Sequence, residues 1–406
     1  MIELTLQQAR YLQILSLGLG HPVIQPVTRE ALLDQIRRLG VLQIDTIHIV
    51  ARSHYFVLWS RLGAYPQHWL DDLLADKQLF EYWAHAACFI PIEDYPLYRW
   101  RMDATQRQWT DPNAWLCRNA EFTRRILEHI HENGAVRSSD FVPESGIRGT
   151  WWSWKAEKSA LEQLFDLGDV MIARREKFQR VYDLADRLHP GIKEWPAFTV
   201  EEARKVFAER TVKSLGVAFP QWIADYFRIR KPGLDRLMRE LVEREMIMPV
   251  KVEGFESSGY IHTASLQLLE EISSGRIAAT TTHILSPFDP LVWDRARLNG
   301  LFGMDFRVEC YTVAEKRKYG YWLLPILHRD EIIGRMDVKA NRQRKVFEVK
   351  GLFLEDGISV TDDLLDELGK TLTACAAWHQ TPQVEISNCP NVRLKSGLES
   401  QIAKLI

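Results

Sequence analysis

The chain lacks the features that define several classes of protein. Its 406 residues include five cysteines without Cys-x-x-Cys spacing, namely Cys88, Cys117, Cys310, Cys375 and Cys389. An odd and dispersed set is typical of reduced cysteines in a cytoplasmic protein, and it argues against a structural zinc site. No apolar run approaches the roughly 20 residues that span a bilayer. The N-terminal stretch MIELTLQQARYLQ lacks the basic segment and apolar core of a signal peptide. We therefore expect a cytoplasmic protein without a membrane segment.

Motifs for nucleotide and zinc chemistry are also missing. The sequence contains no P-loop, no Gly-x-Gly-x-x-Gly and no His-Glu-x-x-His, so we expect neither a cofactor nor a metal ion. A net charge of −2 excludes a generally basic nucleic-acid binder. The charge is nevertheless segregated, because residues 316–345 carry nine Lys and Arg against three Asp and Glu, a net +6 that leaves −8 for the rest. Any nucleic-acid binding must rest on such local patches.

The order of predicted elements indicates an α+β protein with several domains. The length is too great for one core. Helices followed by a β-hairpin recur about every 70 residues, which is the arrangement of tandem winged helix-turn-helix domains, about three in number. After residue 275, four strand-like runs that begin with FRVECYTV precede a helix and predict a mixed C-terminal α/β domain with an antiparallel sheet. The predicted boundaries are 1–105 for the N-terminal helices and first winged helix, 106–195 for the second, 196–272 for the third and 273–406 for the β-rich domain.

Two predicted hairpin turns are basic and are candidates for binding DNA phosphates. Each could equally be a solvated turn, but two basic turns on stacked winged helices favour a DNA surface. Together with Arg52, the candidate DNA-binding residues are Arg174, Arg175, Lys177 and Arg180 in the first turn and Arg342, Arg344 and Lys345 in the second.

The stretch LQIDT places an amide and a carboxylate two residues apart in an apolar surrounding. In an extended strand, Gln43 and Asp45 point to one face and Ile44 to the other, so both polar groups would reach one cavity. The alternative is that Asp45 or Thr46 caps the following helix, as Asp and Thr commonly do. From this pattern alone the helix cap is favoured.

Two further segments contain polar residues that could be functional. In FEYWAHAAC, strand alternation places Glu81, Trp83 and His85 on one face. Glu81 and His85 could support catalysis, although a buried hydrogen-bonded pair that stabilises the wing is the favoured interpretation. In SPFDP, Asp289 lies between two prolines, which predicts a rigid turn in which Asp289 caps the next helix.

Long strings of the sequence resemble the YcaQ (AlkX) branch of the AlkZ-like DNA glycosylases. They are LLDQIRRLGVLQIDTIHIVARSHYFVLWSRLG, EYWAHAACF, FQRVYDL, LSPFDPLVWDR and YGYWLLPILHR…IGRMDVKA, and the likeness extends over about residues 1–380. The resemblance implies a bacterial base excision repair enzyme of tandem winged helices that excises N7-alkylguanine and unhooks interstrand crosslinks of the nitrogen-mustard type. It also implies that Gln43-Ile44-Asp45 is the family's catalytic Gln-Φ-Asp element, where Φ is apolar. The His-Φ-Pro sequence that AlkZ carries on a C-terminal hairpin is absent from the C-terminal strands here, so no groove-contacting residue is assigned from it.

The chemistry of such a lesion explains a catalytic carboxylate. N7-alkylguanine is cationic, so its glycosidic bond is weakened and needs no general acid. Asp45 can stabilise an oxocarbenium-like sugar and activate a water molecule. Gln43 can orient that water or the Asp45 carboxylate through a hydrogen bond. No lysine adjoins the motif, which predicts a monofunctional glycosylase that leaves an abasic site. We expect a monomer that acts on double-stranded DNA with alkylated or crosslinked guanine and is associated with the nucleoid. The alternative is a non-catalytic winged-helix transcription regulator with Asp45 as a helix cap.

Overall fold

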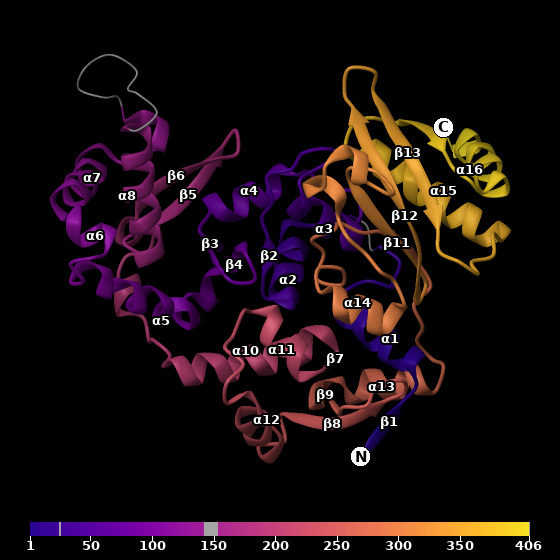
Figure 1. The fold of residues 1–406 in the computed structure, drawn as a ribbon, viewed down its shortest axis with the longest axis horizontal. Coiled ribbons are helices and arrows are strands. Elements are labelled where there is room, and N and C mark those ends of the chain that lie inside the picture. Colours follow the sequence, from indigo (N-terminus) through magenta and orange to yellow (C-terminus); the bar gives the residue numbers. More distant parts are fainter. Residues whose placement is uncertain (24–25, 142–152, 406) are drawn as a thin grey trace. The chain divides into compact units, whose positions relative to one another are not determined.

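A computed structural model describes residues 1–23, 26–141 and 153–405 of the chain (Figure 1). Its internal contacts divide it into two compact units. Unit 1 comprises Met1–Pro66, Ala84–Ala86 and Lys205–Ile406, and unit 2 comprises Gln67–Trp83 and Ala87–Arg204. The division into four domains stays a prediction.

The C-terminal part of unit 1 is a five-stranded sheet in the order β10-β11-β12-β13-β14. The first four strands are antiparallel, and β14 runs parallel to β13. The strands are β10 Thr282–Ile284, β11 Leu323–His328, β12 Glu331–Asn341, β13 Val346–Leu354 and β14 Gln383–Asn388. Helices α15 (Asp362–Trp378) and α16 (Val392–Leu405) pack on each other beside this sheet (Figure 1). The predicted antiparallel C-terminal sheet is confirmed.

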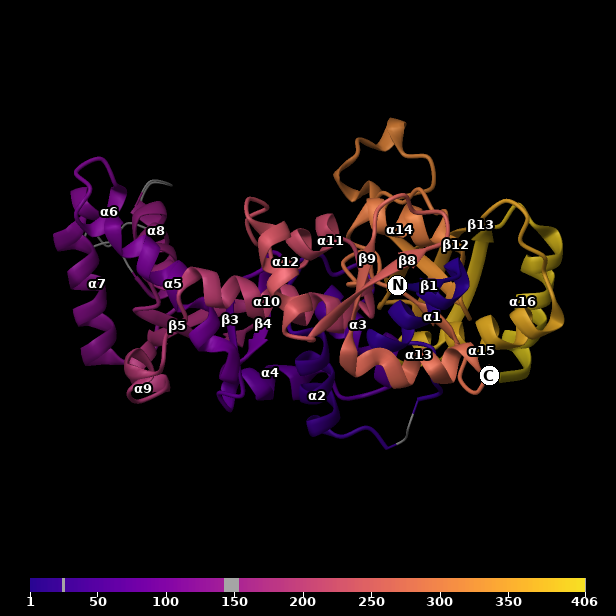
Figure 2. The same ribbon diagram turned by 90° about the horizontal axis from the view of Figure 1, so that it is seen from below.

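One predicted strand of this region is wrong. The run FRVECYTV is an irregular segment with a 3-10 turn at Glu309–Tyr311. It belongs to a long connection between α14 (Arg295–Phe302) and β11, and in Figure 2 this orange segment extends away from the rest of unit 1. Its backbone is held by a buried carboxylate rather than by a neighbouring strand, because Glu309 accepts hydrogen bonds from the backbone of Tyr319 and Gly320.

The second sheet of unit 1 joins the N-terminus to a segment far along the sequence. Its order is β1-β8-β9-β7, with β1 parallel to β8 and the other pairs antiparallel. The strands are β1 Ile2–Leu4, β7 Val217–Ala218, β8 Ile247–Val252 and β9 Gly259–His262. Four helices surround it, namely α1 Leu6–Ser16, α11 Pro220–Tyr226, α12 Leu234–Glu243 and α13 Leu266–Ser273. Helix α12 buries one apolar stripe, Leu234, Leu237, Met238 and Leu241, as the helical spacing predicts.

The segment that leads to the Gln-Ile-Asp motif has sharply defined ends. Helix α2 (Arg29–Leu39) starts where the Thr28 hydroxyl accepts from the Ala31 backbone at 3.1 Å. It ends at Gly40, whose φ of 73° suits glycine, and a Cβ there would lie 2.9 Å from the Phe227 ring. Strand β2 (Leu42–Gln43) follows at once, and α3 (Ser53–Leu62) ends before Gly63 as predicted.

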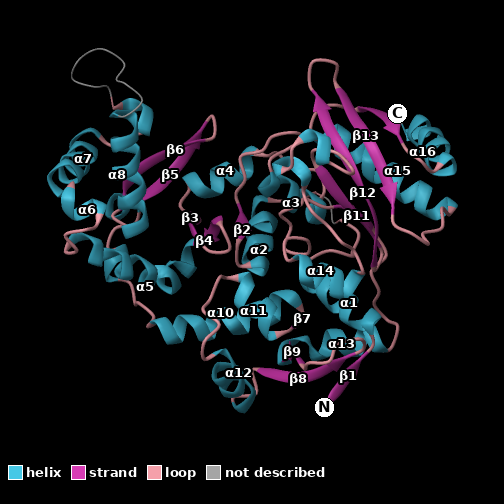
Figure 3. Cartoon of the chain, viewed as in Figure 1, coloured by secondary structure: helices cyan, strands magenta, loops and turns pink. Residues whose placement is uncertain are grey.

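Unit 2 consists of helices and two hairpins (Figure 3). The hairpins are β3 Leu79–Trp83 with β4 Ala87–Pro91, and β5 Val170–Glu176 with β6 Gln179–Leu184, both at the predicted positions. The helices of this unit are α4 His68–Ala75, α5 Tyr95–Gln106, α6 Trp115–Arg118, α7 Ala120–Asn133, α8 Ser153–Leu167 and α9 Ala185–Leu188. Helix α10 (Val200–Leu215) continues from unit 2 into unit 1.

The fold is α+β with several antiparallel sheets. Within the described ranges, no helix combines the length and apolarity that a membrane crossing requires.

Candidate active site

The Gln-Ile-Asp motif lies at the end of β2. Ile44 is buried, whereas Gln43 and Asp45 on either side of it are partly exposed, which follows the alternation of an extended chain. Helix α3 begins only at Ser53 and its N-cap residue is Arg52. The alternative that Asp45 or Thr46 caps this helix is therefore wrong.

The Asp45 carboxylate is held in place by its own loop. Its Oδ1 accepts a hydrogen bond from the Ile47 backbone N–H at 2.7 Å. Burial raises the pKa of Asp45, and the backbone N–H groups of Ile47 and Thr46 and the charge of Arg52 oppose that rise. Asp45 is thus a fixed carboxylate that is a stronger proton acceptor than an exposed aspartate.

A cavity of about 220 Å³ begins beside Gln43. Aromatic and apolar side chains form much of its wall, with two arginines among them. The lining residues in the described part of the chain are Gln43, His85, Ala86, Arg228, Pro287, Phe288, Val292, Trp293, Arg295, Phe306 and Val308. Asp45 is outside this set, two residues along the chain from Gln43.

His85 is the predicted support residue that lines this cavity. Its ring stacks on Trp293, with centroids 4.1 Å apart and planes 12° apart. Arg228 Nη2 lies 3.3 Å from His85 Nε2, and Nδ1 lies 3.3 Å from the Asp225 carbonyl oxygen. Burial and then the Arg228 charge lower the pKa of His85 to about 4. The imidazole is therefore neutral, accepts from Arg228 and donates to Asp225.

Glu81 and Trp83 have other partners, and the predicted Glu81–His85 pair is wrong. Glu81 is 2% exposed and accepts from Arg175 Nε at 2.5 Å and from Arg180 Nε at 3.1 Å. Trp83 donates its indole N–H to Asp166 at 2.7 Å. Glu81 has a structural role in unit 2, as the favoured interpretation held, but the partner groups are arginines.

The hairpin of β12 and β13 is attached to the chain just after the motif. Arg342 at its tip donates to His48 Nε2 at 2.9 Å and to the Val50 carbonyl. The Ala340 backbone N–H also donates to the Ile49 carbonyl at 3.0 Å. Burial, Arg342 and Arg52 lower the pKa of His48 to about 4, so it is a neutral acceptor. These contacts fix the position of the segment that carries Asp45.

A comparison with family models matches residues 36–378 to the description "DNA glycosylase AlkZ-like". This match covers most of the chain. The chain belongs to the AlkZ-like family of DNA glycosylases. Among solved structures, Streptomyces sahachiroi DNA glycosylase AlkZ aligns with a TM-score of 0.63 and 15% identity, covering 95% of this chain and 100% of that chain. At that identity the structural match shows a shared fold, and the predicted assignment to the YcaQ branch is consistent with both findings.

The basic residues predicted to bind DNA differ in their exposure to solvent in this AlkZ-like glycosylase. Arg175 and Arg180 are largely buried against Glu81. The others lie nearer the surface: Arg174 pairs with Glu176 at 2.6 Å, Arg344 pairs with Glu385 at 2.7 Å, and Lys177 and Lys345 occupy turn positions with φ of 49° and 55°. DNA binding by the exposed arginines and lysines stays a prediction, whereas Arg175 and Arg180 hold the buried Glu81 carboxylate.

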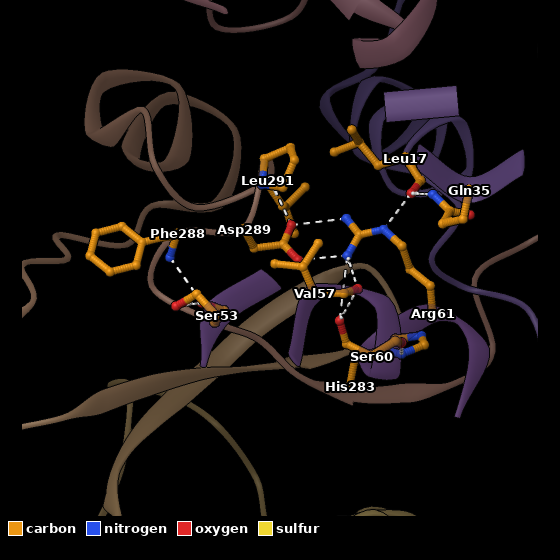
Figure 4. A network of polar contacts seen from close by, with 12 residues as sticks. Leu17, Gln35, Ser53, Val57, Ser60, Arg61, His283, Phe288, Asp289 and Leu291 are labelled. Atoms are coloured by element: carbon orange, nitrogen blue, oxygen red, sulfur yellow. Dashed lines mark hydrogen bonds and ion pairs between the residues drawn. The ribbon is translucent and has the colours of Figure 1, made fainter. Parts of the chain in front are cut away.

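Asp289 of the SPFDP turn makes a contact that the sequence did not reveal (Figure 4). Arg61 of α3 reaches it with two nitrogens, and neither side chain is exposed. Asp289 also accepts from the Leu291 backbone, which makes the rigid turn that was predicted. The next helix, α14, is instead capped by Asp294, which accepts from the Arg297 backbone at 3.1 Å. The prediction that Asp289 caps that helix is wrong.

No group of three or more His, Cys, Asp or Glu able to hold a metal ion occurs among the described residues.

Proposed function

We propose that this AlkZ-like glycosylase hydrolyses the N-glycosidic bond of cationic N7-alkylguanine in double-stranded DNA, leaves an abasic site, and unhooks interstrand crosslinks of the nitrogen-mustard type. The observation that carries the proposal is the fixed, partly buried Asp45 carboxylate next to Gln43 at the edge of an aromatic cavity. Gln43 and Asp45 form the catalytic pair.

A carboxylate with a raised pKa suits this reaction. The alkylated base is already a good leaving group because it departs neutral, so the enzyme needs no general acid. As the bond lengthens, positive charge develops on the sugar, and Asp45 stabilises it while it accepts a proton from the attacking water. Each effect contributes about 10²- to 10³-fold in rate. The Gln43 amide orients the water or the carboxylate through a neutral hydrogen bond.

The position of the cavity bears on how the lesion is presented. A crosslinked guanine is tethered to the opposite strand, so extruding it completely from the helix is physically awkward. Asp45 lies outside the residues that line the cavity. This supports attack on the sugar while the lesion remains largely stacked.

The DNA-binding scaffold in this proposal consists of tandem winged helices. The sequence order helix, helix, hairpin occurs at α7, α8 and β5–β6 and again at α11, α12 and β8–β9. Together with the N-terminal elements, this order supports three tandem winged helices in the proposal. In winged helices the hairpins and helices contact phosphates and grooves, which agrees with the exposed Arg174 and Lys177 at the tip of β5–β6.

The decisive experiment measures base release from a duplex that contains a single N7-methylguanine. Wild type is expected to produce alkali-labile abasic sites. Asp45→Asn is expected to bind the duplex equally well and to lose at least 10²-fold in rate, because the amide supplies neither charge nor a base. The matched control is Asp34→Asn, which changes an exposed aspartate on α2. If wild type releases neither simple nor crosslinked guanine, the proposal is wrong.

A transcription regulator remains the alternative of a different class. A regulator would bind one DNA sequence preferentially, and Asp45→Asn would leave that binding unchanged. The wild-type protein would then release no base.

A second test concerns the monofunctional mechanism. Treatment with borohydride during the reaction is expected to trap no covalent adduct between the enzyme and DNA, and an adduct at a lysine would contradict the hydrolytic mechanism.

A further inference from the structure

The segment between α14 and β11 forms a closed loop with a rigid base. It begins with buried Phe306, and the buried Glu309 carboxylate accepts the backbone N–H groups of Tyr319 at 3.0 Å and Gly320 at 3.1 Å. Residues ten positions apart are thus brought together. Within the loop, Arg317 Nε donates to the Thr312 carbonyl at 2.9 Å. The loop is therefore pre-organised and not a loose connection.

This rigid loop presents apolar side chains to solvent. Tyr311 is 75% exposed and Val313 is 59% exposed, although large apolar side chains are usually covered in folded domains. The intervening backbone is fixed by hydrogen bonds from Thr312 to Glu309 and from Lys316 to Val313. A loop that is held this firmly and still exposes an aromatic ring is suited to contact another molecule.

The loop lies beside the catalytic motif. Phe306 and Val308 at its start line the same cavity as Gln43. Two effects raise the pKa of both the Cys310 thiol and the Tyr311 phenol. The larger is desolvation, and the second is the negative charge of the Asp45 carboxylate. The exposed ring therefore stands close enough to Asp45 for the two groups to interact electrostatically.

Basic residues follow the aromatic ring along the loop. Lys316 and Lys318 are exposed, and Lys318 Nζ lies 4.7 Å from the Tyr319 ring centroid. Arg317 lies over the Tyr321 ring at 4.8 Å. An aromatic side chain followed by cations on one rigid loop is the combination that proteins use to stack on bases and follow a phosphate backbone.

We propose that the loop of residues 309–320 is a DNA-contact element of the active site, in which Tyr311 stacks against a nucleobase at the lesion and Lys316 and Lys318 bind the adjacent phosphates. The proposal rests on the proposed glycosylase function and adds a specific contact to it. Once the alkylated base has been released, the neighbouring bases lose a stacking partner, and the Tyr311 ring replaces it. The abasic sugar is then held beside Asp45.

The test uses a catalysis-independent substrate, a duplex with a tetrahydrofuran abasic analogue beside a 2-aminopurine. Wild type is expected to bind it and to change the 2-aminopurine fluorescence. Tyr311→Ala is expected to bind about ten-fold more weakly and to lose the fluorescence change, as loss of one base-stacking contact predicts. Tyr311→Phe is expected to retain both, because it keeps the ring. The matched control, Val392→Ala, truncates a side chain 78% exposed on α16 and is expected to change neither.

Two outcomes would overturn the proposal. If Tyr311→Ala binds and alters the fluorescence as wild type does, the ring does not stack. If Tyr311→Phe loses as much DNA affinity and fluorescence change as Tyr311→Ala, the contact depends on the hydroxyl and its hydrogen bond with Cys310 instead of on the ring. Because the readout is binding to an abasic analogue, it is separate from base release. A wild type that stacks normally but releases no N7-methylguanine would contradict the proposed function and leave this contact standing.

Discussion

Arg61 and Asp289 form a fully buried bidentate ion pair, with Nη1–Oδ2 at 2.6 Å and Nη2–Oδ1 at 2.9 Å. Two further donors of the guanidinium are also used, because Nε donates to the Leu17 carbonyl at 2.7 Å and Nη1 donates to the Val57 carbonyl at 2.8 Å. The pair joins α3 to the Pro-bounded turn whose next residues line the cavity beside Gln43. It therefore ties the wall of the candidate active site to a helix of the core (Figure 4).

Breaking this pair is expected to be costly. Asp289→Asn should lower the free energy of unfolding by about 3–5 kcal/mol, because Arg61 stays buried without a compensating charge. Urea denaturation followed by tryptophan fluorescence measures the change. The control is Asp34→Asn, which breaks the exposed pair with Arg37 and should change stability by less than about 1 kcal/mol. Equal effects of the two substitutions would contradict the assignment.

Asp45→Asn should leave the protein at least as stable as wild type at pH 7. The folded-state pKa of Asp45 is raised, so the folded protein binds this proton more readily than the unfolded chain does. Stability from this group is highest at low pH and falls as the pH rises through the interval between the two pKa values. The amide of the Asp45→Asn variant does not ionise, so the variant does not lose this stability as the pH rises. Thermal denaturation at pH 7 and pH 4 should show the benefit at pH 7 shrinking at pH 4, and destabilisation at pH 7 would contradict this.

The rate of base release should fall on acidification at a pH above the ordinary aspartate range. Catalysis needs ionised Asp45, and burial raises its pKa from 3.8. Single-turnover rates at saturating DNA, measured from pH 4 to pH 8, should follow one ionisation with the rate rising as the carboxylate forms. His85 and His48 have pKa values of about 4 and stay neutral over most of this range. A rate that increases as the pH falls would contradict a carboxylate base.

The two kinds of basic residue on the β5–β6 hairpin should respond differently to substitution. Arg175→Gln removes a partner from buried Glu81 and should lower the stability of unit 2 by several kcal/mol. Lys177→Gln, at the exposed turn, should leave stability unchanged. It should weaken DNA binding and reduce the slope of log K against log salt by about one. Measuring both quantities for both variants separates the roles, and an unchanged salt slope for Lys177→Gln would exclude it from the DNA surface.

Features fixed by neighbouring residues were predictable from the sequence. The start of α2 at Thr28 and its end at Gly40 follow from short-range capping. The two hairpins of unit 2 also follow from local alternation and turn residues. The run FRVECYTV has the alternation of a strand, but it forms a loop because the distant Tyr319 and Gly320 complete the hydrogen bonds of Glu309. Nothing within that run indicates those partners.

The candidate site was predictable only in part, for the same physical reason. Alternation indicated that Gln43 and Asp45 flank a buried Ile44, and the buried isoleucine agrees. The ion pair of Arg61 with Asp289 joins residues 228 positions apart. Each residue alone is equally compatible with a surface position, so no single sequence indicates the pairing. The same holds for Glu81, whose arginine partners lie on a different hairpin.

The attachment of Arg342 to the segment after Asp45 gives a final prediction. Arg342→Gln removes the charged donor to His48 and Val50 and leaves the Ala340–Ile49 backbone hydrogen bond in place. A small displacement of a catalytic group can lower a rate by up to about 10²-fold. We therefore expect a roughly ten- to hundred-fold lower single-turnover rate at saturating DNA.

The pKa of His48 tests whether this loss comes from the lost contact. The Arg342 charge is one of the causes that hold that pKa near 4, so the variant should shift it upward when His48 is titrated by NMR. The matched control is Arg344→Gln on the same hairpin tip, whose side chain pairs with Glu385 and Glu348. It should weaken DNA binding without lowering the rate at saturation or moving the His48 pKa. A contact that positions Asp45 must affect the chemical step after DNA binding is complete. An Arg342→Gln variant that loses only DNA affinity would therefore show that the hairpin serves phosphate binding alone.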